Sequence, residues 1–347
     1  MILSGEYAVL HGAPALAVAI KRHAQILITS RSEPPCILES SLFHEHAIPF
    51  HVDLGGIKEQ QDSLIAQNLP LVYEIFNQVM PKLHNGRWNA SPFRMVLDTR
   101  DFFGEKNLSH LKIGLGSSAA LLVAMTAACK CYFAAEDHEP CHKISWPEIW
   151  TVHQNIPGQH GSGLDVASSY HGQLISFQKM PDNSYPTVRF VKWPTSLHLG
   201  MVWTGRSTET GAMLKLLAKW RESHPRLFQS AIDRLTDAAL QSATLADQGQ
   251  TSLLIQSFRL YGEALSSLSR ASGINIISRE HQEIEARATK MGLVYKSSGA
   301  GGGDIGFAAT EDLDLLKRFQ HTIEAMGYHV MPVPIDPSGL TVKRQTE

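Results

Sequence analysis

A glycine-rich loop that runs into a helix is the feature that most constrains this chain. Gly114 and Gly116 precede Ser117, Ser118 and an apolar segment of small residues that ends at Cys129. Glycine has no Cβ, so its backbone can take left-handed dihedrals and come close to a bound anion. The first amides of a helix have no partners inside it and lie at the positive end of its dipole. The segment predicts either a phosphate-binding loop or an ordinary glycine turn with a serine cap, because short motifs also match by chance.

Length and composition favour a soluble globular protein. At 347 residues the chain exceeds the size at which one core usually stops growing, so we expect two domains with a cleft between them. With 43% apolar residues, 18% charged residues and a formal net charge of −2, we expect neither nucleic acid nor a membrane surface as a partner. We also expect no transmembrane helix and no secretory signal. The four cysteines are sparse and unevenly spaced, which favours reduced thiols in the cytoplasm.

Hydrophobic periodicity and turn signals predict both strands and helices. Strands are expected at 25–31, 93–98, 174–177, 199–203 and 305–309, and helices at 64–80, at 146–155 and over long stretches of 212–291. Ser145 and Glu148 have the spacing of a capping box and mark the start of the helix at 146–155. Proline and polar residues at 180–186 interrupt the apolar pattern, which favours a domain boundary there.

Two further glycine-rich loops adjoin regular elements. The first, at 157–167, contains Gly161, Gly163 and Asp165, so it places a carboxylate at the lip of a flexible loop. The second runs from Lys296 to Asp304 and directly precedes an apolar run. A linker rarely lies directly against a strand in mid-domain. Three such loops make most sense if their backbones converge on one ligand.

The order and content of these loops resemble the GHMP family of small-molecule kinases, named for galactokinase, homoserine kinase, mevalonate kinase and phosphomevalonate kinase. The stretch Gly5–Leu10 is similar to the first family motif, Gly114–Ala120 to the phosphate loop, and Gly299–Asp304 to the third motif. The match extends over nearly the whole chain. It implies an α+β chain with the two-domain GHMP kinase fold: a domain like ribosomal protein S5 domain 2 at 1–182, and a ferredoxin-like domain at 183–347.

The resemblance also implies a site for ATP and Mg²⁺. The residues expected to bind the nucleotide are Lys112, Gly114, Leu115, Gly116, Ser117, Ser118 and Ala119. Ser118 resembles the family serine whose hydroxyl lies on Mg²⁺ and is expected to act in catalysis. Asp165 matches the carboxylate that faces the acceptor, where it takes a proton or stabilises developing charge; the plain alternative is a helix cap. The residues expected to bind the substrate are Glu6, Tyr7, Ser162, Gly163, Arg206, Lys296, Gly299, Ala300, Gly301 and Gly302.

Two positions depart from the family pattern. The family usually has a lysine a few residues before the Gly-Glu pair, and here its place falls one residue ahead of Met1, so the lysine is either absent or lies upstream. Without it, the site loses a positive charge that would orient Asp165. Gln154 occupies the place of a Mg²⁺-binding glutamate and is the expected metal ligand there, offering one neutral oxygen.

Several details resemble the phosphomevalonate kinase subfamily. Tyr7 stands where mevalonate kinases usually carry histidine, Lys112 enters the phosphate loop, and the run at 153–167 is similar to that subfamily's catalytic segment. The resemblance implies transfer of the γ-phosphoryl of ATP to phosphomevalonate by a monomer or homodimer. Alternatives are mevalonate kinase or another small-alcohol or sugar kinase of this fold, the ATP-dependent decarboxylase relative, and a non-catalytic nucleotide-binding sensor.

Overall fold

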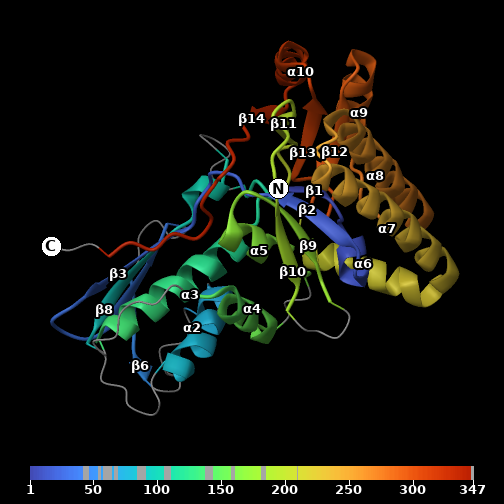
Figure 1. Cartoon of the computed structure of the whole chain (residues 1–347). Coiled ribbons are helices and arrows are strands. Elements are labelled where there is room, and N and C mark those ends of the chain that lie inside the picture. Colours follow the sequence, from blue (N-terminus) through green and yellow to red (C-terminus); the bar gives the residue numbers. More distant parts are fainter. Residues whose placement is uncertain are drawn as a thin grey trace. The chain divides into compact units, whose positions relative to one another are not determined.

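The computed structural model describes residues 1–41, 47–53, 56–57, 65, 69–83, 91–104, 111–136, 144–157, 161–180, 185–208 and 210–344 (Figure 1). Contacts group the chain into two units that alternate along the sequence. Unit 1 comprises Met1–Lys21, Phe103–Leu115 and His171–Gly339, and unit 2 comprises Arg22–Phe102, Gly116–Tyr170 and Leu340–Glu347. The continuous domains expected at 1–182 and 183–347 divide the chain differently and stay a prediction.

Unit 1 contains two four-stranded antiparallel sheets. The first has the order β1 (Ile2–Ser4), β2 (Pro14–Val18), β9 (Leu174–Gln178) and β10 (Thr187–Val191). The second has the order β12 (Val294–Ser298), β13 (Ile305–Thr310), β11 (His198–Trp203) and β14 (His329–Met331). The Ser298 hydroxyl joins them, because it accepts from Ile2 N at 3.0 Å and donates to Ile2 O at 2.8 Å. Strands from both ends of the sequence thus share one unit.

The helices of unit 1 follow from amphipathic patterns and local caps. The expected helical stretch at 212–291 is confirmed as α6 (Thr210–Ser223), α7 (Pro225–Asp247), α8 (Thr251–Ser272) and α9 (Arg279–Met291). The unit also contains the 3₁₀ helix η1 (Ala8–His11) and α10 (Leu313–Ala325). Ser278 caps α9 by accepting from His281 N, and Asp312 caps α10 by accepting from Leu315 N. Helices α8 and α9 both contact β12, so the third glycine motif begins at a strand held by two helices (Figure 1).

Unit 2 combines a mixed sheet with a helical layer. The sheet order is β3 (Gln25–Ser30), β8 (Phe93–Asp98), β4 (Cys36–Ser40) and β5 (Ile48–Phe50), in which β4 and β8 are parallel and the other pairs antiparallel. A short ribbon pairs β6 (Val52–Asp53) with β7 (Gly56–Ile57), and η2 (Arg100–Phe102) follows β8. The helices are α2 (Pro70–Leu83), α3 (Ser117–Glu136), α4 (Trp146–Asn155) and α5 (Leu164–His171).

The core of unit 2 includes α3 residues from Ala119 to Phe133, so it holds this helix along its length. Phe50, Phe76, Phe93 and Phe133 form an aromatic cluster in which Phe93 lies 5.5 Å from Phe133 between ring centroids. The α3 helix packs against α2, α4 and β3, which holds the end of the phosphate loop. The capping box expected at Ser145 is confirmed, since its amide donates to Glu148 Oε2 at 2.8 Å.

Two further expectations from the sequence, on the cysteines and on the helix at 64–80, are not confirmed in full. Cys36 and Cys129 are free thiols, but Cys131 is in a disulfide bond, so the expectation of four reduced cysteines is wrong at Cys131. The expected start of a helix at residue 64 lies outside the described residues, and α2 begins at Pro70. Among the helices that the structure describes, none is long and apolar enough to cross a membrane.

Candidate functional site

The first glycine loop leads into the N-terminus of α3, as the sequence predicts. Gly114 has a φ of 86°, a left-handed conformation that glycine adopts without strain. The helix begins at Ser117, and Ala120 N donates to Gly116 O at 3.1 Å. Because the first amides of an α-helix have no partner within it, this end of α3 can bind an anion. The Ser118 side chain is exposed there.

Asp165 lies beside the phosphate loop within unit 2. A Cβ built on Gly116 would lie 3.6 Å from the Cβ of Asp165, so the two backbones are neighbours. Asp165 is the second residue of α5 and is exposed. The Ser162 hydroxyl accepts a hydrogen bond from Leu164 N at 3.2 Å, so the start of α5 has a serine as its acceptor. The geometry therefore gives the Asp165 carboxylate a place next to the amides of the loop.

Close packing fixes the second glycine loop against α4. A Cβ at Gly163 would collide with the Trp150 ring and would lie 3.0 Å from His153 Nε2. Trp150 and His153 lie on one face of α4 with ring centroids 5.5 Å apart, and His153 is buried. Gln154, the expected metal ligand, is the next residue and is exposed. Only glycine fits at position 163, and it brings the residues before Asp165 onto the α4 surface.

Within unit 1, the first and third motifs contact each other. The Tyr7 hydroxyl donates to Ala300 O, and Tyr7 is buried with a left-handed φ of 62°. Burial raises the pKa of this phenol, so it keeps its proton and remains a donor. Gly302 N donates to Ile276 O at 2.8 Å, which anchors the middle of the third motif. These bonds hold the first and third motifs together within unit 1, and the expected convergence of the three glycine-rich loops on one ligand stays a prediction.

Glu6 and Lys296 form a buried ion pair in unit 1. The exposed fractions are 4% for Glu6 and 2% for Lys296, and the ammonium donates to Glu6 Oε1 and, at 2.7 Å, to Ser297 O. It also lies 5.3 Å from the centre of the Tyr261 ring, a cation–π distance. Burial lowers the pKa of Lys296, and the charge of Glu6 opposes that shift. The ammonium of Lys296 is paired within the interior, whereas Glu6 Oε2 has no hydrogen-bond partner among the described residues. The substrate-binding role expected for both residues stays a prediction.

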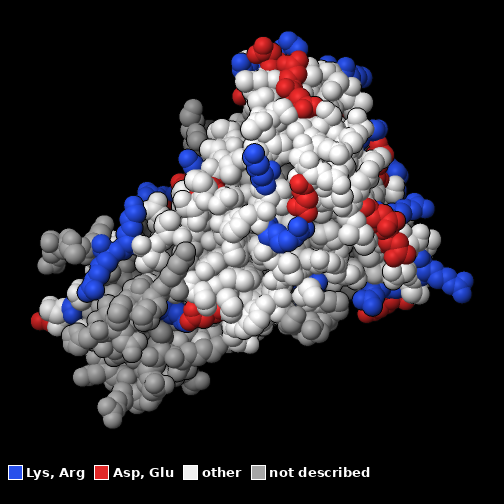
Figure 2. Space-filling model, viewed as in Figure 1, with Lys and Arg blue, Asp and Glu red and all other residues white. Residues whose placement is uncertain are grey.

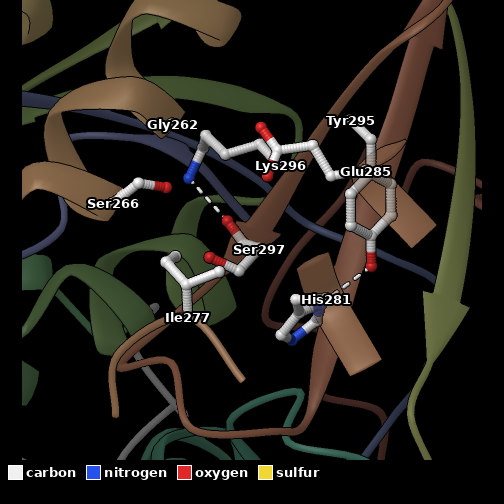
Figure 3. A pocket seen from close by; sticks show the side chains of 8 residues that line it. All are labelled: Gly262, Ser266, Ile277, His281, Glu285, Tyr295, Lys296 and Ser297. Atoms are coloured by element: carbon white, nitrogen blue, oxygen red, sulfur yellow. Dashed lines mark hydrogen bonds between the residues drawn. The ribbon is translucent and has the colours of Figure 1, made fainter. Parts of the chain in front are cut away.

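Lys296 also lines a small pocket behind the third motif (Figure 3). The pocket is lined by Gly262, Ser266, Ile277, His281, Glu285, Tyr295, Lys296 and Ser297. Its walls come from α8, α9, β12 and the segment between α8 and α9. Burial raises the pKa of Glu285, with Glu263 adding to the shift. Most of the lining side chains carry polar groups, and the His281 ring lies 2.9 Å from the Tyr295 hydroxyl, within hydrogen-bond distance.

Asp304, which closes the third motif, contacts the phosphate loop. A Cβ at Gly114 would collide with the Asp304 carboxyl group, so the loop passes directly over this side chain. Its Oδ1 atom accepts from Thr208 N at 3.1 Å. Burial raises the pKa of Asp304 to about 6, against the opposing effect of the Thr208 amide. The sequence signal for this residue is an acid at the end of a glycine run.

We expect Asp304→Asn to stabilise the protein at neutral pH. The folded carboxyl has a pKa of about 6 against an ordinary 3.8, so the folded state binds more protons between these values, and stability falls as the pH rises through this window. Asparagine cannot ionise, keeps an acceptor for Thr208 N and tolerates the left-handed φ of 56°. The free energy of unfolding in urea should rise by about 1–3 kcal/mol at pH 7.5 and change little at pH 4. Asp237→Asn, at an exposed position on α7, is the control; an equal effect of Asp304→Asn at both pH values would refute the assignment.

Arg206 lies against the third motif but pairs with a neighbour. Its Nε atom is 3.0 Å from Glu280 Oε1, and the side chain is 70% exposed. Its carbonyl accepts from Asp304 N at 2.8 Å. To contact a substrate phosphate, as expected, the Arg206 guanidinium would have to leave the Glu280 carboxylate or contact both anions at once.

The expected residues fall into one group in each unit. Unit 2 contains Gln154 and the residues Gly116, Ser117, Ser118, Ala119, Ser162, Gly163 and Asp165. Unit 1 contains Glu6, Tyr7, Lys112, Gly114, Leu115, Arg206, Lys296, Gly299, Ala300, Gly301 and Gly302. Lys112 is exposed and forms a strand-like bridge with Phe103. Charges of both signs occur side by side around α9 and α10 on the face drawn in Figure 2.

Known proteins resemble this chain over nearly its full length, although no family model matches it. A phosphomevalonate kinase from Streptomyces sp. strain CL190 is 24% identical over 97% of this chain and 95% of the relative. A mevalonate kinase from Saccharolobus solfataricus is also 24% identical, over 93% and 92%.

Solved structures show the same fold. The Lin0012 protein from Listeria innocua superposes with a TM-score of 0.81 at 22% identity, covering 96% of this chain and 95% of that one. A Streptococcus pneumoniae phosphomevalonate kinase in complex with phosphomevalonate and AMPPNP superposes with a TM-score of 0.73 at 19% identity, covering 96% and 97%. At these identities, the structural likeness establishes the fold.

Proposed function

Because the chain belongs to the GHMP kinase superfamily and has its two-domain α+β fold, we propose that it transfers the γ-phosphoryl of ATP to phosphomevalonate. The superfamily includes ATP-dependent small-molecule kinases. Phosphomevalonate is the acceptor proposed for this chain. The product would be diphosphomevalonate. The two relatives reported above are named as a phosphomevalonate kinase and a mevalonate kinase.

The observation that carries the proposal is the contact between Gly116 and Asp165. Phosphoryl transfer requires a protein to hold donor and acceptor in line and to balance charge on the moving group. A Cβ on Gly116 would lie 3.6 Å from the Cβ of Asp165, so a carboxylate stands next to amides suited to phosphate. In this position Asp165 would take the proton of the acceptor hydroxyl or stabilise the charge that develops on it.

The residues around the loop fit ATP and Mg²⁺. Backbone amides of Gly114–Ala119 would bind the phosphates of ATP. The exposed hydroxyl of Ser118 and the exposed amide oxygen of Gln154 are ligands of the kind that Mg²⁺ accepts. Bound Mg²⁺ would neutralise phosphate charge. Because both of these ligands are neutral, waters and nucleotide oxygens would complete the coordination.

The assignment of phosphomevalonate rests on particular residues. Tyr7 occupies the position where mevalonate kinases usually carry histidine, and its hydroxyl is already used by Ala300 O. Arg206 is exposed beside the third motif and offers a guanidinium for a second phosphate. Gly299–Gly302, Ser162 and Gly163 are further acceptor-binding residues that the resemblance to the family implies.

A coupled ADP-release assay on the full chain tests this function. We expect turnover with phosphomevalonate and Mg²⁺-ATP, and none with mevalonate, diphosphomevalonate or a panel of sugars. Turnover with mevalonate would contradict the proposed acceptor but would still agree with kinase activity. Turnover with diphosphomevalonate would indicate the decarboxylase relative. Nucleotide binding without turnover on any acceptor would favour a sensor.

A further inference from the structure

We propose that His281 is a positioning residue that holds the peptide between Gly303 and Asp304 and, through Asp304, the Gly114 turn of the phosphate loop. The inference deepens the proposed function, because it names a residue outside the three motifs that shapes the nucleotide loop. All of its parts lie in unit 1.

The hydrogen bonds of His281 define its protonation state. Its Nε2 atom lies 2.8 Å from Gly303 O. Its Nδ1 atom lies 2.9 Å from the Tyr295 hydroxyl, a contact drawn in Figure 3. A carbonyl oxygen can only accept, so Nε2 must carry a proton. Burial lowers the pKa of His281, so the ring is neutral and Nδ1 accepts from Tyr295. Burial raises the pKa of Tyr295, which keeps that donor protonated.

The peptide that His281 holds is fixed on both sides. The Gly303 carbonyl accepts from His281, and the Asp304 amide donates to Arg206 O at 2.8 Å. Asp304 has a φ of 56°, which is uncommon outside glycine and costs free energy. Such a conformation persists where surrounding contacts determine it. The two hydrogen bonds are part of those contacts, together with the bonds that Thr204 donates to the Asp304 carbonyl and Thr208 N donates to its carboxylate.

Asp304 passes this constraint to the phosphate loop. A Cβ at Gly114 would collide with the Asp304 carboxyl group, so the backbone of the loop rests on that side chain. If the peptide before Asp304 rotated, the carboxyl group would move under Gly114. Amides that bind phosphate must be held in place before the ligand arrives, because disorder in the loop would have to be removed on binding.

The test compares three variants. His281→Leu removes both hydrogen bonds and leaves the buried Gly303 carbonyl without its donor. His281→Gln restores a donor at the Nε2 position. Ile284→Ala is the matched control, because Ile284 is a fully buried residue on the same helix and its loss destabilises the core of unit 1. Hydrogen exchange of peptides spanning 299–304 and 111–116 is measured on the full chain, and AMPPNP affinity is measured by calorimetry.

We expect His281→Leu to speed exchange in both segments by roughly tenfold or more, since a buried carbonyl loses its partner. AMPPNP affinity should fall by a similar factor. His281→Gln should return both measurements to within roughly threefold of wild type. Ile284→Ala should lower global stability without raising exchange selectively in these two segments. In ¹⁵N spectra of histidine-labelled protein, one buried ring should show the neutral Nε2–H tautomer, and its signal should vanish in His281→Leu.

Three outcomes would overturn the inference. The first is unchanged exchange at 299–304 in His281→Leu, the second is equal loosening in Ile284→Ala, and the third is changed exchange without a change in AMPPNP affinity. Hydrogen exchange does not depend on catalysis, so a chain that fails the phosphomevalonate assay but shows the expected pattern keeps this inference and loses only its proposed acceptor. If exchange changes but AMPPNP affinity does not, His281 holds the third motif without positioning the phosphate loop, and the proposal fails.

Discussion

Asp165→Asn is expected to lower kcat by about 10²- to 10⁴-fold and to leave AMPPNP affinity within about threefold of wild type. The carboxylate acts only once the acceptor hydroxyl attacks, so its loss removes stabilisation of the transition state and little of the ground state. Asparagine has the same shape and keeps an oxygen acceptor. In the wild type, Val166 N donates a hydrogen bond to Asp165 Oδ1 at 3.0 Å. Asp165 is exposed, so we expect no change in folding stability.

Steady-state kinetics with the acceptor identified in the ADP-release assay measure this effect, and calorimetry measures nucleotide binding. Asp101→Asn, at an exposed carboxylate on η2 of the same unit, controls for loss of one negative charge. Wild-type kcat in Asp165→Asn would remove Asp165 from its role. A loss of AMPPNP affinity as large as the loss of kcat would instead assign it to nucleotide binding.

Lys296→Met is expected to lower the free energy of unfolding by about 3–5 kcal/mol, because it leaves the Glu6 carboxylate buried without its counter-charge. Glu6 Oε2 already has no hydrogen-bond partner among the described residues, so nothing nearby compensates for the lost ammonium. The Glu6→Gln/Lys296→Met double variant removes both charges and should recover much of that loss. Urea unfolding of the wild type, both single variants and the double variant gives the coupling free energy.

The comparison of the single and double variants supplies the check. A deficit below 1 kcal/mol for Lys296→Met at pH 7 would contradict the pairing of the two charges. A Glu6→Gln/Lys296→Met double variant that is no more stable than Lys296→Met would contradict it as well.

Local signals made much of this molecule predictable. The glycines at 114 and 116, the capping box at Ser145 and the breaks between the helices of 212–291 act through neighbours a few residues away, and the structure confirms the elements they predict. The three family motifs also gave the fold class, because their order along the chain is itself a sequence property.

Long-range contacts were outside the reach of those signals. Glu6 and Lys296 are 290 residues apart, and nothing in either local sequence says that a lysine beside a glycine motif will be buried against a glutamate in the first. His281 was hidden for the same reason, since it lies inside an amphipathic helix and its partners are on other elements. The alternation of the two units likewise depends on strand partners such as β2 and β9, which are distant in sequence.

The arrangement of unit 1 has a consequence for biosynthesis. Strands β1 and β2, helix η1, Glu6 and Tyr7 belong to a unit whose other strands and helices lie in His171–Gly339. During translation, β2 cannot pair with β9 until β9 has been synthesised. Glu6 cannot pair with Lys296 until position 296 has left the ribosome. Non-local pairings of this kind form late. The nascent chain therefore carries an apolar strand and a carboxylate without its counter-ion through most of translation, a state in which chaperones have the most time to bind.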